Sequence, residues 1–313
     1  MGRHSLFKLE ADYPGHPLAK QLREKFIQGT DAVPGAERLR QQAKIKEAAG
    51  QLRDACYLML QAADIWPALP GLDEDFKRIF GKYPILLVAV RELPDRFAPW
   101  APPGTPDSRV AQLLHIPLME VAGVGENTQF SSRVLDEPPE LAELGRRITL
   151  RIKPGLLWSD GERPITASDV TRSLNARLDK SLPSFDAALN SIVKTYDDTG
   201  PYEVVVDLHR TQLRPQTNFL FNVAAGHRLI GDRFDQNAAV GAGPFRFLTK
   251  KTGTEVSLRA NKNFFAGQPK IAEIVERRYP TGKDGVKALL AGDVAMLEHV
   301  PPKELKRIEA RTE

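Results

Sequence analysis

The stretch from Ile148 to Val170 constrains the fold more than any other part of the sequence. It reads ITLRIKPGLLWSDGERPITASDV, so an alternating strand runs into a Pro-Gly turn, a tryptophan and a second tight turn at Asp-Gly. A threonine then precedes an aspartate by three residues, which is the spacing of a capping box at a helix start. We therefore expect a strand, two turns and a helix, with structural roles for Trp158, Asp160, Gly161, Thr166 and Asp169.

Residues 1–80 differ in composition from the rest and predict an α-helical N-terminal segment. They are rich in Ala, Leu, Gln, Lys and Arg, and between Glu37 and Ile65 apolar residues recur at steps of three and four. This spacing indicates either one long amphipathic helix or a helical hairpin, ended by Pro67 and Pro70. A short helix over residues 73–80 should follow.

From Tyr83 onward the pattern changes to short β-type runs that alternate with helices. Ile85–Val90 is a continuous apolar run, typical of a strand buried on both faces of a sheet. Residues 91–106 contain five prolines and should form an extended loop. The irregular alternation predicts a mixed α/β domain over residues 81–313. Helices are expected at residues 108–118, 168–178 and 283–291, and strands at residues 147–152, 191–195, 202–208, 244–249, 254–259 and 271–279.

Composition and motifs argue against an enzyme, a metal site and a nucleic-acid partner. Cys56 is the only cysteine, which excludes an intrachain disulfide and a cysteine zinc cluster. The six histidines show no HxxxH or HExxH spacing, and there is no Walker A loop, dinucleotide fingerprint or G-x-S-x-G elbow. The 44 basic and 40 acidic residues are interspersed, so the net charge of +4 forms no basic patch. No catalytic residue, metal ligand or cofactor is therefore assigned.

Neither an export signal nor a membrane span is expected from the sequence. The first residues, MGRHSLFKLEADYPGHP, contain no apolar core of a signal peptide. Nowhere does an uninterrupted apolar run reach the roughly 18 residues of a spanning helix. If the protein works outside the cytoplasm, an upstream segment is expected to supply the export signal.

Three further segments, together with the stretch described first, give the sequence a family resemblance. They are Gly241-Ala-Gly-Pro-Phe245, then Leu258–Pro269, which reads LRANKNFFAGQP, and Ala288–Val294, which reads ALLAGDV. In this order they resemble the signature of solute-binding proteins of family 5, which serve ABC importers of oligopeptides, dipeptides and nickel. The resemblance makes Gly243 and Pro244 structural residues of a turn.

The resemblance implies a type II periplasmic-binding-protein fold, of which residues 81–313 would form one mixed-sheet α/β lobe. In that family a ligand is captured by closure of a cleft between two lobes, without chemistry. The implied ligand is a peptide-like or other small solute. The implied partners are the membrane subunits of an ABC transporter, and the implied location is periplasmic or extracytoplasmic.

The sequence also departs from the family. The loop at residues 91–100 corresponds only loosely to the usual Leu-Asp-Pro loop, and Ala295 stands where a second acidic residue is common. Family members are much longer, and their second lobe follows the helix that ends in Gly-Asp. Because the chain stops at Glu313, we expect a truncated lobe that binds peptide-like ligands weakly or not at all.

Residues that face the cleft can be selected only by their position in loops and at helix starts. For the aromatic ones, packing beneath a loop is the alternative to ligand contact. Arg109 is either a surface cation or a clamp for a peptide carboxylate. The candidate ligand-binding residues are Phe97, Trp100, Ser108, Arg109, Phe185, Gly226 and His227.

A different class of function stays open, namely a scaffolding or regulatory protein that reuses a solute-binding lobe. Residues 1–80 would then be an interaction surface or the remnant of an upstream domain. A DNA-binding head fits poorly, since basic and acidic residues almost cancel in this segment and it contains no convincing helix-turn-helix.

Overall fold

The computed structural model describes residues 17–123, 129–226, 229–230, 233–234 and 239–310. Contacts between Cα atoms divide the chain into two compact units, Met1–Ile85 and Leu86–Glu313. Apolar side chains form a core within the first unit and two cores within the second. Each unit is therefore described by itself.

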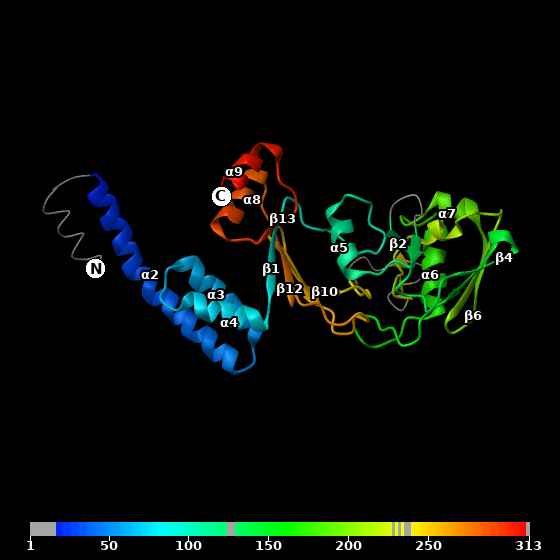
Figure 1. Ribbon diagram of the computed structural model, residues 1–313, viewed down its shortest axis with the longest axis horizontal. Coiled ribbons are helices and arrows are strands. Elements are labelled where there is room, and N and C mark those ends of the chain that lie inside the picture. Colours follow the sequence, from blue (N-terminus) through cyan, green and yellow to red (C-terminus); the bar gives the residue numbers. More distant parts are fainter. Residues whose placement is uncertain (1–16, 124–128, 227–228, 231–232, 235–238, 311–313) are drawn as a thin grey trace. The chain divides into compact units, whose positions relative to one another are not determined.

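The first unit consists of three helices around a small apolar core. Helix α2 spans Pro17–Ala48, α3 spans Leu52–Ile65 and α4 spans Leu72–Lys82 (Figure 1). Helices α2 and α3 form a hairpin, with Gly50 in the turn at a φ of 73°, a conformation that glycine adopts without strain. The buried core residues are Ala36, Ala43, Ala55, Cys56, Met59, Ala62, Leu69, Leu72 and Ile79.

A buried carboxylate ties α4 to α2. Asp75 is 8% exposed, and its oxygens lie 2.6 Å from Arg40 Nε, 2.8 Å from Arg78 Nη2 and 3.0 Å from Lys44 Nζ. Burial raises the pKa of the Asp75 carboxyl, but the hydrogen bonds from the three cations outweigh burial and lower that pKa to about 2. The unit is thus held by a compensated polar cluster as well as by its apolar core.

The second unit contains two main sheets, of which the first has five strands in the order β10-β11-β12-β1-β13. Strand β1 pairs in parallel with β13, while β10, β11 and β12 are antiparallel neighbours. Residues 87–90 of β1 are each at most 7% exposed, which confirms the buried strand predicted from the apolar run. The strands span Ile85–Val90 (β1), Phe245–Lys251 (β10), Glu255–Ala260 (β11), Glu273–Arg278 (β12) and Met296–Leu297 (β13).

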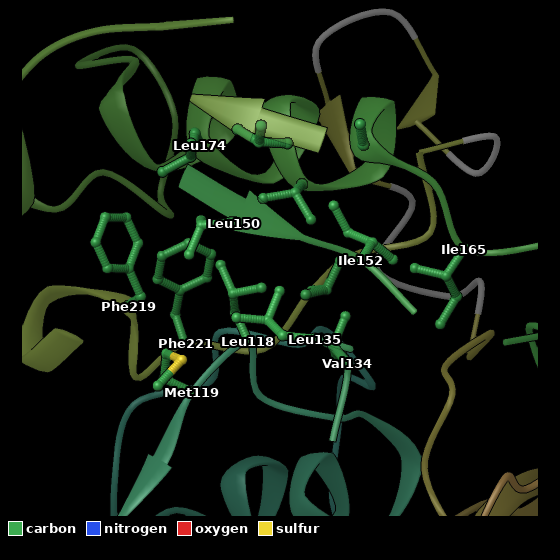
Figure 2. Close-up of a cluster of buried hydrophobic side chains, with 14 of the residues drawn as sticks. Leu118, Met119, Val134, Leu135, Leu150, Ile152, Ile165, Leu174, Phe219 and Phe221 are labelled. Atoms are coloured by element: carbon green, nitrogen blue, oxygen red, sulfur yellow. The ribbon is translucent and has the colours of Figure 1, made fainter. Parts of the chain in front are cut away.

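The second sheet is antiparallel, has the strand order β4-β5-β7-β6, and carries the larger core. Its strands span Glu140–Ala142 (β4), Arg147–Arg151 (β5), Val193–Gly200 (β6) and Glu203–Leu208 (β7). Helices α6 (Ala167–Leu178) and α7 (Ala187–Ile192) pack against it. Figure 2 shows Leu150 of β5 and Leu174 of α6 in this core with the ring of Phe219.

The remaining elements are short. Helix α5 begins after its N-cap Thr105 and stops before His115, earlier than predicted, because Pro117 disfavours helical backbone at the residue before it. Neither α7 nor the small hairpins were predicted, since each has too few residues to show a period. The short elements of this unit are α5 (Pro106–Leu114), α8 (Gly282–Ala291), α9 (Leu305–Glu309), the hairpin of β2 (Glu120–Gly123) and β3 (Gln129–Ser131), and the hairpin of β8 (Leu229–Ile230) and β9 (Arg233–Phe234).

The stretch from 148 to 170 contains the strand, the turns and the helix start that its residues predict. Trp158 is fully buried in the larger core, and Gly161 adopts a φ of 75° in the second turn. Asp160 Oδ1 accepts a hydrogen bond from the Glu162 N–H at 3.2 Å. At the start of α6, Asp169 Oδ2 accepts the Thr166 N–H at 2.9 Å, which satisfies a donor that the helix itself leaves free.

The Gly-Ala-Gly-Pro motif packs tightly against another backbone segment. A Cβ atom on Gly241 would lie 1.9 Å from the carbonyl oxygen of Leu114, and one on Gly243 would lie 2.5 Å from that of Leu113. The Gly243 N–H donates to the Leu114 carbonyl at 2.8 Å. The two glycines therefore allow the motif to pack directly on the last turn of α5.

Replacing Gly241 with alanine should lower the free energy of unfolding by about 3 kcal/mol, because the added methyl group meets backbone atoms that cannot rotate away. Gly200→Ala is the matched control, since a Cβ there meets nothing within 4 Å, and its effect should stay within about 0.5 kcal/mol. Urea denaturation, followed through the buried Trp158 indole, measures both. Equal stabilities of the two variants would contradict the packing role assigned to Gly241.

Candidate functional site

Two adjacent cavities lie between the proline-rich loop after β1 and the segment that joins α6 to α7. Their volumes are about 590 and 640 Å³. Both are lined by Trp100, Ala101, Pro102, Pro183 and Ser184, and we therefore treat them as one feature, the Trp100 groove. The first cavity also reaches Arg96, Asp107, Ser181 and Leu182, and the second also reaches Arg177, Phe185, Asp186 and Asn222.

The Trp100 side of the groove is pinned to a distant part of the chain. The Trp100 indole Nε1 donates to the carbonyl of Asn222 at 2.8 Å, and the Asn222 side-chain amide donates back to the carbonyl of Pro99 at 2.8 Å. Prolines fix φ along this loop, so little backbone freedom is left between these bonds. Trp100 thus presents a large apolar surface from a loop that is held in place.

The opposite side is fixed by hydrogen bonds to the end of α6. Ser184 Oγ donates to the carbonyl of Ala176 at 2.6 Å, and the Asp186 N–H donates to the carbonyl of Arg177 at 2.7 Å. The Asp186 carboxylate also caps α7 by accepting the Leu189 N–H at 3.0 Å. Hydrogen bonds to backbone carbonyls of α6 and the N-cap of α7 therefore fix the position of this wall.

An internal ion pair lies along the second cavity. The Arg177 guanidinium donates to the Asp186 carboxylate and lies 5.0 Å from the centre of the Phe221 ring. Burial raises the pKa of the Asp186 carboxyl, but the Leu189 N–H and the charge of Arg177 lower it further, so the net direction is below its usual value. The two charges compensate each other inside the groove.

A second carboxylate shapes the first cavity from the start of α5. Asp107 Oδ1 accepts the backbone N–H of Asp95 at 2.7 Å and that of Arg96 at 3.3 Å. The loop backbone before Trp100 is thereby tied to the first turn of α5. The exposed Arg96 side chain starts from this fixed point on the cavity wall.

The structure brings together two of the residues predicted from the sequence, Trp100 and Phe185, in the groove. Phe97 lies elsewhere, 6% exposed in the core of the five-stranded sheet, with its ring centre 4.6 Å from that of Phe247. Ser108 serves the start of α5, where its hydroxyl donates to the carbonyl of Thr105 at 2.8 Å.

The last two predicted residues are Gly226 and His227, of which only Gly226 is described. Gly226 is buried, donates to Asp169 Oδ1 at 2.9 Å and accepts a bond from Arg172 Nη1 at 2.9 Å. His227 lies outside the described residues.

Arg109 is held by carboxylates of its own chain. Its Nε and Nη2 donate to the two oxygens of Glu276 at 2.7 and 2.9 Å, and its Nη1 donates to Glu298. Burial lowers the pKa of Arg109, but the two carboxylates outweigh burial and raise it. With Glu276 only 2% exposed, this pair joins α5 to β12 and to the segment after β13.

Several residues of the groove could not be identified from the sequence pattern. Asn222 and the Arg177–Asp186 pair depend on contacts that only the folded chain creates. Arg96 stands in the predicted loop next to Phe97 and could have been selected as one of the loop's charged residues.

Neither a metal cluster nor a membrane-spanning helix is found in the described part of the chain. No group of three or more His, Cys, Asp or Glu side chains there could hold a metal ion. None of the helices described is both long and apolar enough to cross a membrane.

Comparisons with known proteins point to one family. Residues 131–313 match the sequence profile of the bacterial extracellular solute-binding proteins, family 5, in its middle region. The oligopeptide-binding protein AppA of Bacillus subtilis (strain 168) is 27% identical over 175 residues, which are 53% of this chain and 32% of AppA. The chain thus spans about a third of the length of this relative.

Solved structures agree on the fold. AppA from Bacillus subtilis in complex with a nonapeptide superposes with a TM-score of 0.64 at 21% identity, over 72% of this chain and 45% of that chain. The binding protein AgaA in complex with agropinic acid, from A. tumefaciens R10, gives a TM-score of 0.63 at 23% identity, with the same coverage of 72% and 45%. These matches confirm the predicted fold of the periplasmic-binding-protein type.

His115 anchors the loop that carries the groove. It is 2% exposed, and its Nε2 donates to the carbonyl of Phe97 at 2.8 Å. Its Nδ1 has no hydrogen-bond partner among the residues described and lies beside Gly241. Burial lowers the pKa of His115 to about 4, against a smaller opposing effect of the Phe97 carbonyl.

Acid should therefore destabilise the fold through His115. Its pKa is about 4 in the folded chain and 6.5 as the ordinary value, so the unfolded chain binds more protons between these two values. The free energy of unfolding should fall by about 2 kcal/mol as the pH drops from about 7 to about 5. A His115→Asn variant should lack this part of the slope in denaturation at matched pH values. If both proteins lose stability in parallel, the assignment to His115 is wrong.

Proposed function

Because this chain belongs to the bacterial extracellular solute-binding proteins, family 5, we propose that residues 86–313 form one lobe of a ligand-capturing module for an importer of peptides or related small solutes. The family match over residues 131–313 carries this proposal. The module acts outside the cytoplasm and delivers its ligand to the membrane subunits of an ABC transporter. Its work is binding, without a chemical step.

The Trp100 groove is the proposed ligand wall of this lobe. Its cavities of about 590 and 640 Å³ fall in the range of small-molecule pockets, roughly 300–1,000 Å³. An aromatic ring and prolines supply apolar contact, while Arg96, Asp107 and Ser181 supply polar groups. AppA, which is named an oligopeptide-binding protein and has been solved with a nonapeptide, supports a peptide-like ligand.

Ligand binding in such a module depends on enclosure. A ligand between two lobes loses water on both sides, which strengthens every polar contact that it makes. One lobe covers only one side, so residues 1–313 should bind peptides weakly. Calorimetric titration should therefore give no dissociation constant of about 1 μM or tighter.

Weak binding can be detected residue by residue through the indole N–H signals of the three tryptophans. In ¹⁵N-labelled protein, millimolar tripeptides should shift the signal of Trp100, which lines the groove, in a saturable manner. Trp158, buried in the core, and Trp66, in the first unit, should stay unchanged. The Trp100→Phe variant assigns the signal by removing it. Absence of any shift, or equal shifts of all three signals, would contradict the groove as a ligand wall.

A further inference from the structure

Four charged side chains line the Trp100 groove, and three of them are already engaged. Asp107 accepts two backbone N–H groups, while Arg177 and Asp186 form an ion pair. The guanidinium of Arg96 makes no hydrogen bond and no ion pair with any residue that the structure describes. A ligand entering the groove therefore meets one guanidinium whose N–H donors are not used by the described residues.

Asp107 is a carboxylate on the wall of the same cavity, but it forms no ion pair with Arg96. Asp107 uses one oxygen for the Asp95 and Arg96 N–H groups, and it lies in the first turn of α5, where the helix dipole also favours a negative charge. These bonds hold the Asp107 side chain against the loop backbone. The Arg96 guanidinium thus keeps its N–H donors available for a ligand, although the negative charge of Asp107 lies on the same cavity wall.

The chemistry of Arg96 selects for a carboxylate. A guanidinium presents planar, parallel N–H donors that match the two oxygens of a carboxylate. Trp100, Pro102, Leu182 and Pro183 add apolar surface to the walls of the same cavity, against which the rest of a ligand can pack. The backbone of Arg96 is fixed by Asp107, so its side chain starts from a constant place on the wall.

We propose that Arg96 binds a carboxylate of the ligand, so that the groove prefers carboxylate-bearing peptides or solutes to neutral ones of the same size. This inference rests on the proposed function and assigns the specificity of that same site. It makes Arg96 a specificity-determining residue that contacts the ligand directly.

The test compares two tripeptides, trialanine with a free C-terminus and trialanine amide, with the Trp100 indole signal as the readout. The free acid should half-saturate the shift at a concentration about tenfold lower than the amide, as expected for a charge-assisted hydrogen bond. In Arg96→Gln the difference should disappear, and in Arg96→Lys it should return in part, since lysine keeps the charge without the fork. Arg210→Gln is the matched control, because Arg210 is exposed and lines neither cavity.

A third peptide, alanyl-glutamyl-alanine amide, separates two sources of the carboxylate. If it binds like the free acid, any carboxylate suffices, and if it binds like trialanine amide, Arg96 takes the C-terminus. Equal half-saturation by trialanine and its amide in the unchanged chain would overturn the role of Arg96 and leave the proposed function intact. A Trp100 signal that stays silent with every peptide would overturn both.

Discussion

The close approach of Gly241 and Gly243 to the last turn of α5 joins the two halves of residues 86–313. The Leu114 carbonyl accepts the Gly243 N–H at 2.8 Å, and the Gly241 carbonyl accepts the Ser159 N–H at 2.8 Å from the turn after Trp158. On the other side, the Asn261 side chain donates to the Gly243 carbonyl at 2.9 Å from the end of β11. Backbone-to-backbone contact at this distance leaves no room for a Cβ atom. The five-stranded sheet, α5 and the larger core therefore share one junction, and the groove depends on all three.

The groove depends on α5 because residues at both ends of this helix hold the proline-rich loop in place. His115 at the end of the helix holds the Phe97 carbonyl, Asp107 at its start holds the backbone before Phe97, and Trp100 then reaches across to Asn222. The proline-rich loop is consequently fixed at three points, although it has no regular structure. Such a loop costs little further conformational entropy when a ligand binds, since its backbone freedom was lost on folding. A preformed wall of this kind suits a module whose task is binding.

The sequence predicted most of the architecture because its signals are local. The apolar run of β1, the capping box at Thr166 and the turn glycine at Gly161 act over a few residues, and the structure contains each of them. The site was predictable only in part, since its contacts are not local. Arg109 looked like a possible carboxylate clamp, but Glu276, 167 positions away, engages it. Loop position alone could not separate Phe97, which packs inward, from Trp100, which lines the groove.

The strength of an ion pair between Arg96 and a ligand depends on whether a second surface covers the groove. Across an open wall, the field of Arg96 is screened by water and salt, so a ligand carboxylate gains less from it than in an enclosed site. When a second surface closes over the cavity, the effective dielectric constant falls and the same pair becomes several times stronger. The Arg177–Asp186 pair changes little on closure, because its charges already compensate each other. Closure therefore strengthens the pair between Arg96 and a ligand carboxylate, and the discrimination expected on this single wall is smaller than that of the enclosed site.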